Sequence, residues 1–373
     1  MSLSNRTAVF ALVGDVTGSS RALRQLRVLA DAGVATTVLQ TAPLRDLEAV
    51  DATVHVLPAD GGGPRGFWRA HRALRSAALA TPAALYLASD LYSLPALATA
   101  AKRHGGALVY DSRELYAALD STHGRPLVGR VWGTLEGRYI GRADAVLTVG
   151  DAIADRLAAT YGIERPIVLY NAPEPEPEPA PDRTALAGAL HLPDDGRMVV
   201  LYQGLFREGR GLRALVEAVR RVDEARLVCI GEGALAEEVE AAGPTLGDRL
   251  VVSPFVPPDR LAALTPGADL GACLIEPLTE SLRLSLPNKL FEYLSAGVPV
   301  LASPLPEIRA VVDRGVGVLA DPADPEAVAD ALRRSLDPAV RAQWTENAHA
   351  ALAPYTWTRG RHTFRHLLDR LLA

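Results

Sequence analysis

The stretch that decides the fold is SLPNKLFEYLSAGVPV, residues 285–300. Pro287 suits the first turn of a helix, where a missing N–H group is tolerated, and Leu290 and Tyr293 recur at the spacing of an apolar helical face. Gly297 supplies the left-handed residue that commonly ends a helix, and the run after it favours an extended segment. We therefore predict a turn, a short helix and the start of a buried strand.

Three polar side chains of this helix share a second face. Glu292 follows Asn288 by four residues and Lys289 by three, near an N-terminus whose free N–H groups favour an anion. A nucleotide suits this combination, because Lys289 would hold phosphate while Glu292 accepts hydrogen bonds from the ribose. A surface helix with a Lys–Glu pair is the alternative. Only two of the 39 basic residues are lysine, Lys102 and Lys289. Because arginine is the usual cation of this chain, a lysine at position 289 indicates that a compact, flexible positive charge is needed there.

Length and composition limit the classes of protein to consider. A chain of 373 residues is too long for one ordinary domain, and 49% hydrophobic residues suffice for two cores. The net charge of −5 argues against a nucleic-acid-binding protein. Cys229 and Cys273 each lie in an apolar run, which predicts buried free thiols and a reducing compartment. No signal peptide and no membrane-spanning run is evident, so we expect a cytoplasmic protein.

Short β-rich runs alternate with helical patterns along nearly the whole chain. Expected strands are residues 8–13, 35–40, 53–57, 84–89, 107–111, 145–150, 166–170, 198–204, 226–231, 250–255, 269–275, 298–303 and 316–320. Expected helices are residues 20–31, 66–80, 92–103, 127–141, 151–160, 211–221, 234–241, 258–264, 287–296, 305–313, 325–336, 338–352 and 357–372. This alternation predicts an α/β architecture with doubly wound, largely parallel sheets.

A proline- and glutamate-rich tract, PEPEPEPAP, divides this alternation into two halves. Such a tract makes neither a helix nor a central strand, and its like charges keep it extended. We therefore expect a linker at 173–183 between a first Rossmann-like domain, 1–172, and a second, 184–354. The two would face each other across a cleft, since ligands of such sheets bind beyond the carboxyl ends of the strands.

A second candidate for phosphate binding is the strand–turn–helix MVVLYQGLFREGRGLRALVEAVRR, residues 198–221. Gly204 and Gly211 allow a tight turn, and Arg207 and Arg210 face the opening before the helix. The tract lacks the Gly-Lys-Ser/Thr ending of a P-loop, and a solvated loop is the alternative. Because this tract and the helix described above fall in one domain, together they predict two grips on one diphosphate.

The second half resembles family 4 of the retaining GT-B glycosyltransferases (glycosyl transferases group 1), and the likeness extends over nearly the whole chain. The motifs that carry it are YQGLFREGRGL, IGEG and LPNKLFEYLSAGVPVLAS in the second half, and LYLASDLYSLPALATAAKRHGGALVYDSRELY, LTVGDAIADRLAATYG and LYNAP in the first. The resemblance implies a GT-B fold of two Rossmann-like domains facing each other across a cleft. It also implies that the last helix, about 355–373, returns to the first domain.

The resemblance implies a nucleotide-sugar donor held mainly by the second domain. Arg210 stands where the family commonly has a phosphate-binding lysine, and Lys289 and the amides near Asn288 complete the grip on the diphosphate. Glu292 holds the ribose. The remaining residues implied on the donor side are Gly204, Arg207, Gly231 and Val256, of which the last two lie in loops that flank the base.

On the acceptor side, the implied residues are Gly14, Gly18, Asp90, Asp111, Arg113, Glu114 and His123. For His123 an ordinary surface histidine is the alternative. Two positions depart from the family: Leu205 stands where an arginine is usual, and Leu284 where a glutamate often contacts the donor sugar. Glu276 and Glu280 are the candidate replacements for that glutamate.

We therefore expect a hexosyltransferase-type enzyme that moves a sugar from a nucleotide-diphosphate sugar to a small-molecule, glycan or lipid-linked acceptor, with retention. No cofactor and no metal are expected, because no Asp-x-Asp pair occurs and Arg210 and Lys289 would meet the charge of the leaving diphosphate. The alternatives are a nucleotide-sugar epimerase of GT-B fold and a non-catalytic nucleotide-sugar-binding partner protein. A nicotinamide oxidoreductase is disfavoured, since no Gly-x-Gly-x-x-Gly follows the first strand.

A stripe of arginines follows one face of an expected helix within RGFWRAHRALR. The stripe consists of Arg65, Arg69, Arg72 and Arg75. We expect a solvated helix face, with an acceptor phosphate or a peripheral membrane surface as the alternative contacts.

Overall fold

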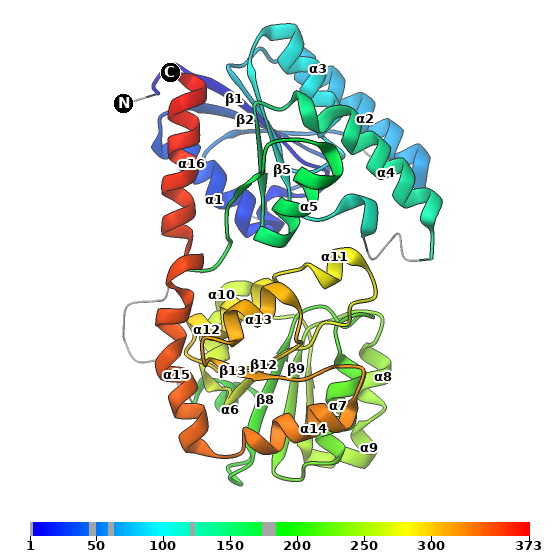
Figure 1. The fold of residues 1–373 in the computed structure, drawn as a ribbon, viewed down its shortest axis with the longest axis vertical. Helices are drawn as coiled ribbons and strands as arrows, with labels where there is room; N and C mark the ends of the chain where they lie inside the picture. Colours follow the sequence, from blue (N-terminus) through cyan, green and yellow to red (C-terminus); the bar gives the residue numbers. More distant parts are fainter. Residues whose placement is uncertain (1–2, 45–49, 59–62, 120–123, 174–183) are drawn as a thin grey trace. The chain divides into compact units, whose positions relative to one another are not determined.

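The computed structural model describes residues 3–44, 50–58, 63–119, 124–173 and 184–373. The chain forms two compact units: Met1–Asn171 with Trp357–Ala373 (unit 1), and Ala172–Thr356 (unit 2). In each unit a parallel sheet is covered by helices on both faces, which is the doubly wound α/β architecture expected from the sequence (Figure 1). The expected linker lies, apart from Pro173, outside the described residues.

Unit 1 is built on a seven-stranded sheet. Its strands are β1 (Thr7–Ala11), β2 (Ala35–Gln40), β3 (Thr53–Val56), β4 (Leu85–Ala88), β5 (Ala107–Ser112), β6 (Ala145–Thr148) and β7 (Ile167–Val168). Their order across the sheet is β3-β2-β1-β4-β5-β6-β7, and these pairings are parallel. Each lies where the sequence predicts a strand, and most end earlier than predicted because the apolar run continues into the loop.

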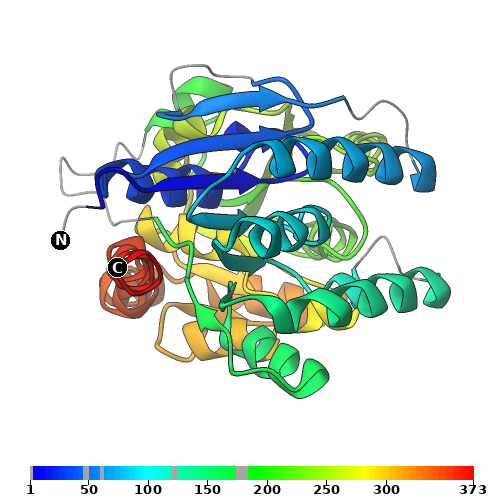
Figure 2. The same ribbon diagram turned by 90° about the horizontal axis from the view of Figure 1, so that it is seen from above.

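Helices cover the two faces of this sheet. They are α1 (Ser20–Asp31), α2 (Gly63–Ala80), α3 (Leu94–His104), α4 (Pro126–Tyr139), α5 (Asp151–Tyr161) and α16 (Trp357–Leu372). Helices α1 and α16 pack together on one face, while α2, α3 and α4 lie on the other (Figures 1 and 2). Phe364 and Leu368 of α16 are buried in the same core as Leu26 and Leu29 of α1, so the last helix is part of unit 1.

Unit 2 is built on a six-stranded sheet of order β10-β9-β8-β11-β12-β13, again with parallel pairings. Its strands are β8 (Met198–Gln203), β9 (Ala225–Ile230), β10 (Leu250–Ser253), β11 (Leu270–Cys273), β12 (Val300–Ala302) and β13 (Gly317–Leu319). Cys229 in β9 and Cys273 in β11 are fully buried free thiols, as predicted.

Three helices of unit 2 were not predicted from the sequence. Within the described residues, the complete set of α-helices in this unit is α6 (Ala185–Leu190), α7 (Leu212–Arg220), α8 (Ala236–Glu240), α9 (Gly243–Leu246), α10 (Pro258–Leu264), α11 (Glu280–Arg283), α12 (Asn288–Ser295), α13 (Pro306–Val312), α14 (Pro325–Arg334) and α15 (Pro338–Leu352). The unpredicted helices α6, α9 and α11 have six, four and four residues, too few to show a helical period in the sequence.

Each sheet has a switch point beside its first strand. In unit 1, β1 lies between β2 and β4, and in unit 2, β8 lies between β9 and β11. The connections on the two sides of such a strand run over opposite faces of the sheet, so the loops at its carboxyl end diverge and leave room for a ligand. The loops after β1 and after β8 are therefore where each unit would bind one.

A buried ion pair joins α1 to β5 in unit 1. Asp111 is fully buried, and its carboxylate accepts hydrogen bonds from Arg21 Nε (2.7 Å) and Nη2 (2.8 Å) and from Gln25 Nε2 (2.8 Å). The Arg21 guanidinium also donates to the carbonyls of Leu169 and Thr148. Removing one partner of such a pair leaves an uncompensated charge in the interior.

We expect Arg21→Met to lower the free energy of unfolding of unit 1 by about 3–5 kcal/mol, because Asp111 would keep its charge without its main partner. Urea unfolding followed by circular dichroism measures the effect. Arg361→Met is the matched control, since Arg361 pairs with Asp31 at the surface, where about 0–1 kcal/mol is expected. Equal effects of the two substitutions would contradict this account of the buried pair.

Candidate functional site

Lys289 projects from the first turn of α12 to the carboxyl end of β8. Its Nζ lies 3.9 Å from the centroid of the Tyr202 ring, close enough for a cation–π interaction. A Cβ atom placed on Gly204, the residue after β8, would lie 3.8 Å from the same Nζ. The ammonium group therefore lies at the switch point of unit 2.

The environment of Lys289 disfavours its own charge. Burial lowers the pKa of Lys289 to about 8, the nearby Arg210 guanidinium acts in the same direction, and the Glu292 carboxylate opposes both. Within the described part of the chain, no carboxylate forms an ion pair with Lys289. An anion bound here would therefore restore the charge of the ammonium and gain a strong electrostatic contact.

Glu292 lies one turn further along α12 and contacts a different partner. Its side chain is exposed, and Oε2 accepts a hydrogen bond of 2.7 Å from Nε2 of Gln203. Within the described residues no ion pair in direct contact joins Glu292 to Lys289, although the Glu292 carboxylate raises the pKa of Lys289 from a greater distance. The cation and the carboxylate are held separately, as binding to different parts of one ligand requires.

The two ends of α12 bear out most of what its sequence predicts. Pro287, with φ −70° and ψ 138°, precedes the helix, so the helix begins one residue later than expected, and no side chain caps it. Its first N–H groups are oriented toward an anion approaching along the axis. At the other end Gly297 has φ 70°, its N–H donates to Leu294 O, and Val298 N donates to Tyr293 O, the two bonds of a Schellman motif.

Arg207 and Arg210 bring two more cations to Tyr202. Burial raises the pKa of the Tyr202 phenol, and the positive charges of Arg210 and Arg207 oppose that rise. The loop after β8 thus contributes cations from one side and α12 from the other. The two tracts predicted to hold a diphosphate thus both lie in unit 2, and Lys289 connects them by its contact with Tyr202 of β8.

Gly211 fixes where the arginine loop ends and α7 begins. It has φ 63°, and a Cβ atom there would lie 2.4 Å from the Cβ of Leu274. Its N–H donates a 3.0 Å hydrogen bond to Oε1 of Glu276. Glu276, one of the two candidates for the missing donor-sugar contact, thus accepts a hydrogen bond at the start of α7. The other candidate, Glu280, lies in α11, where it forms an ion pair with Arg283.

The loop after β9 packs directly on the loop after β8. Gly231 has φ 154°, and a Cβ atom there would lie 1.9 Å from the carbonyl oxygen of Gly204. Gly204 N donates to Ile230 O, and Phe206 N donates to Glu232 O. Val256, half-buried, follows β10. The residues predicted to flank a base thus follow the carboxyl ends of β9, which is the neighbour of β8, and of β10, which is the neighbour of β9.

In unit 1, Asp90 anchors the loop after β1. It is buried, and its carboxylate accepts hydrogen bonds of 2.7 Å from the backbone N–H groups of Val13 and Ser93. Burial raises the pKa of Asp90, and the positive charge of Arg113 opposes this rise. Gly14, with φ 126°, donates from its N–H to Thr41 Oγ1. The structure brings Gly14, Asp90 and Arg113 together around the switch point of unit 1.

The other residues predicted on the acceptor side differ in position. Asp111 is enclosed with Arg21 and Gln25, so it supports β5 from inside and offers no surface to an acceptor. Glu114 is exposed after β5, and Gly18 ends the short turn after β1. His123 lies outside the described residues.

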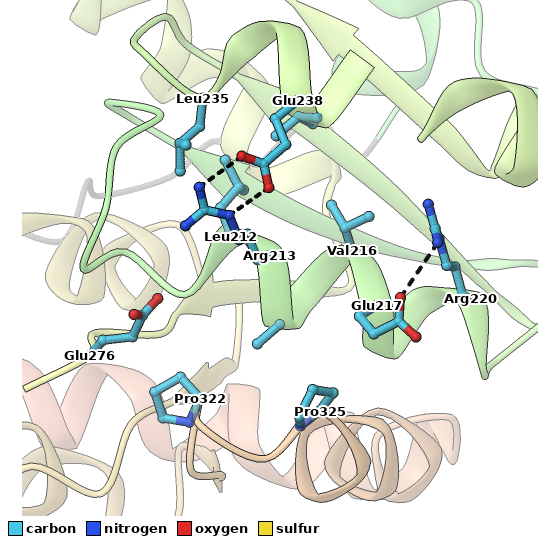
Figure 3. Close-up of a pocket in the computed structure, with 12 residues that line it drawn as sticks. Leu212, Arg213, Val216, Glu217, Arg220, Leu235, Glu238, Glu276, Pro322 and Pro325 are labelled. Carbon is cyan, nitrogen blue, oxygen red and sulfur yellow. Dashed lines mark hydrogen bonds and ion pairs between the residues drawn. The ribbon is translucent and has the colours of Figure 1, made fainter. Parts of the chain in front are cut away.

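The arginine stripe lies on α2 of unit 1, and a pocket in unit 2 borders the start of α7. Exposed Arg69, Arg72 and Arg75 lie on α2, while the side chain of Arg65 falls outside the description. In unit 2 a pocket of about 480 Å³ lies between α7, α8 and the start of α14 (Figure 3). Arg213 in its wall is neutralised by Glu208 and Glu238, so the pocket offers no unmatched charge to an anion.

Sequence reasoning missed Gln203 and Thr265. Gln203 is the last residue of β8 and is almost fully buried, and Thr265 Oγ1 lies 3.1 Å from its Oε1. A polar residue at the end of the apolar run MVVLYQG was the available signal for Gln203.

Among the described residues, no group of three or more metal-ligating side chains occurs, and no helix is long and apolar enough to cross a bilayer.

Comparison with known proteins identifies the family. The model of the "Glycosyl transferases group 1" family matches residues 197–337, and that of the "Glycosyl transferase 4-like domain" matches residues 17–172. A curated relative, the D-inositol 3-phosphate glycosyltransferase of Acidothermus cellulolyticus, is 30% identical over 249 residues, which cover 59% of this chain and 53% of the relative. The chain thus spans about half the length of the curated relative that it matches. It belongs to the group 1 glycosyltransferases.

Solved structures establish the fold. Alr3699/HepE of Anabaena in complex with UDP has a TM-score of 0.77 at 18% identity, covering 98% of this chain and 100% of that one. Sucrose-phosphate synthase of Thermosynechococcus elongatus has a TM-score of 0.81 at 18% identity, covering 98% and 99%. The fold expected from the family resemblance, GT-B with two Rossmann-like units, is confirmed.

We expect Gly231→Ala to destabilise unit 2 by roughly 3–5 kcal/mol, because the new methyl group would overlap the Gly204 carbonyl oxygen and force the two loops apart. Gly243→Ala is the control, since nothing lies within 4 Å of a Cβ atom at that position. Urea unfolding monitored by tryptophan fluorescence measures both variants. A Gly231→Ala protein as stable as the control would show that the loops do not need this close approach.

Proposed function

We propose that this protein is a glycosyltransferase that moves a sugar from a nucleoside-diphosphate sugar to an acceptor hydroxyl, with retention of configuration and without a metal ion. The observation that carries the proposal is the position of the Lys289 ammonium over Tyr202 and beside Gly204, at the carboxyl end of β8 and at the uncapped N-terminus of α12. Arg207 and Arg210 follow the same strand in the sequence. Support comes also from Anabaena Alr3699/HepE, whose structure was solved with UDP-glucose.

Different residues of the site would bind different parts of the donor, according to charge. Lys289, Arg210 and the N–H groups at Asn288 would hold the diphosphate, and exposed Glu292 would accept hydrogen bonds from the ribose hydroxyls. The base would lie against the loops that contain Gly231 and Val256. The sugar would then extend from the diphosphate toward the acceptor. Unit 1 would contribute the acceptor-binding residues, with those around Gly14 and Arg113 as its candidates.

The reaction breaks the bond between the anomeric carbon and the β-phosphate oxygen and forms one to the acceptor oxygen. The leaving diphosphate takes the bonding electrons, and the cations stabilise that charge more as it develops. In retention the acceptor hydroxyl approaches on the face that the diphosphate leaves, and a diphosphate oxygen takes its proton. Exclusion of water would prevent hydrolysis of the donor.

The function is tested by a screen of UDP-, GDP- and dTDP-sugars, first by thermal shift and then by release of nucleotide in the presence of pooled small-molecule, glycan and lipid-linked acceptors. Acceptor-dependent release is the expected outcome. Conversion of the sugar without an acceptor would indicate an epimerase, and binding without turnover would indicate a nucleotide-sugar-binding partner protein. Activity unchanged by EDTA is expected if side chains alone meet the charge.

Glu292→Ala should weaken nucleoside-diphosphate binding by about 1.5–3 kcal/mol, the contribution of hydrogen bonds to a charged group. Isothermal titration with the nucleotide found in the screen measures the change. Glu346→Ala, which removes an exposed carboxylate on α15, is the matched control and should bind as the wild type does. Unchanged affinity in the Glu292 variant would remove this residue from the site.

Lys289→Ala should lower kcat by about 10²–10³, because it removes one group that stabilises the leaving diphosphate, while the midpoint of unfolding changes little. An alanine variant with full activity would refute the assigned role.

Lys289 also predicts that diphosphate affinity depends on pH. Its pKa of about 8 means that the free protein loses this charge as the pH rises through 8, so diphosphate affinity should fall above that pH. Lys289→Arg should flatten this fall, because a guanidinium stays charged.

A further inference from the structure

A buried amide connects the donor side of unit 2 to its core. Gln203, 3% exposed, donates from Nε2 to Glu292 Oε2 (2.7 Å), across 89 positions of sequence. Its Oε1 lies 3.1 Å from the hydroxyl of buried Thr265, which follows α10. The chain of contacts therefore runs from the interior, through the amide, to an exposed carboxylate.

The chemistry of the three groups fixes the orientation of the amide. A carboxylate can only accept, so the NH₂ end of Gln203 must face Glu292, and the carbonyl end then faces Thr265. The Thr265 hydroxyl, also 2.8 Å from Leu261 O, can donate to either carbonyl oxygen. With the amide reversed, its oxygen would face the Glu292 carboxylate, and the two oxygens would repel each other.

The backbone of Gln203 is held separately from its side chain. Gln203 N donates to the hydroxyl of Tyr293 (3.0 Å), and that hydroxyl donates to Leu201 O (3.0 Å). Tyr293 follows Glu292 on α12, and its ring is fully buried. Helix α12 is thus attached to β8 by a tyrosine that does not depend on the Gln203 amide. A change confined to the amide should therefore leave the helix in place.

We propose that Gln203, oriented by Thr265, is a positioning residue that holds the Glu292 carboxylate for the ribose of the donor and so sets the preference for a ribonucleotide over its 2′-deoxy form. The inference rests on the proposed function, because it assigns Glu292 to the ribose. With Oε2 engaged by the amide, the other oxygen and the remaining lone pairs of the carboxylate are presented in one orientation. Without the amide, Glu292 samples several rotamers, and part of its binding free energy is lost in ordering it.

The experiment measures dissociation constants by isothermal titration for UDP, GDP or ADP, whichever the wild type binds most tightly, and for the same nucleotide without its 2′-hydroxyl. Gln203→Met keeps the length of the side chain but removes the donor. We expect about three- to tenfold weaker binding of the ribonucleotide, the contribution of one hydrogen bond, and a smaller loss for the 2′-deoxy form. Thr265→Val should show the same pattern to a lesser degree.

Gln203→Glu gives a readout that a merely structural role would not change. It sets two carboxylates against each other, which raises the pKa of one of them. Ribonucleotide affinity should then recover as the pH falls, because a protonated carboxyl at position 203 can donate to Glu292 again. Gln203→Met has no titrating group there and should show no such recovery.

Two controls separate positioning from general destabilisation. Ser335→Ala removes another buried hydroxyl of unit 2, at the end of α14, and should leave both affinities unchanged. Adding Gln203→Met to a Glu292→Ala protein should cause no further loss of ribonucleotide affinity if the amide acts only through that carboxylate.

The outcomes distinguish this inference from the proposed function. A wild type that binds neither these three nucleotides nor dTDP contradicts the proposed function. A wild type that binds only dTDP, or that binds a ribonucleotide no better than its 2′-deoxy form, overturns the inference alone. A wild type that binds and prefers the ribonucleotide, with Gln203→Met retaining that preference in full, overturns the inference alone. An equal loss for both sugar forms in Gln203→Met, or an additive loss in the double variant, also overturns it.

Discussion

A cation held against an aromatic ring, with no carboxylate among the described residues in direct contact with it, is the constraint on which the candidate site in unit 2 depends. An ammonium group in such a place is less stable than the same group in water, which is why the pKa of Lys289 falls to about 8. The fold offsets this cost through the surrounding core, and binding of an anion would recover it. Under the proposed function, such a site would be preorganised for negative charge, so that it could stabilise a leaving diphosphate without rearranging itself.

The parallel sheet supplies the geometry that makes this constraint useful. At the carboxyl end of β8 the neighbouring connections diverge, and α12 enters the gap with its N-terminus uncapped. Gly231 lets the loop after β9 press against Gly204, so the arginine loop and the helix stay close. Tyr293 then attaches α12 to the end of β8. A Cβ atom at Gly231 would lie 1.9 Å from the Gly204 carbonyl oxygen, so a side chain there would force the two loops apart.

Local patterns in the sequence predicted local features, and tertiary contacts account for what they missed. The period of residues 285–300 predicted α12, and Gly297 predicted its end, because both are decided within a few residues. Asp111 was implied on the acceptor side by the family resemblance of its motif, YDSRELY, yet Arg21, 90 positions away, encloses it. Gln203 and Glu292 are 89 positions apart, and no spacing rule connects them. Helices of four to six residues have no period to detect.

The central claim, that the ammonium of Lys289 contacts the donor diphosphate, can be measured directly because the chain has only two lysines. Protein labelled with ¹⁵N and ¹³C at lysine side chains should give two side-chain signals by NMR, with exposed Lys102 as an internal reference. The account predicts that Lys289 titrates with a pKa of about 8 in the free protein and that a bound nucleoside diphosphate raises this pKa while leaving the Lys102 signal in place. A Lys289 signal whose titration is unaffected by a nucleotide that demonstrably binds would contradict the account.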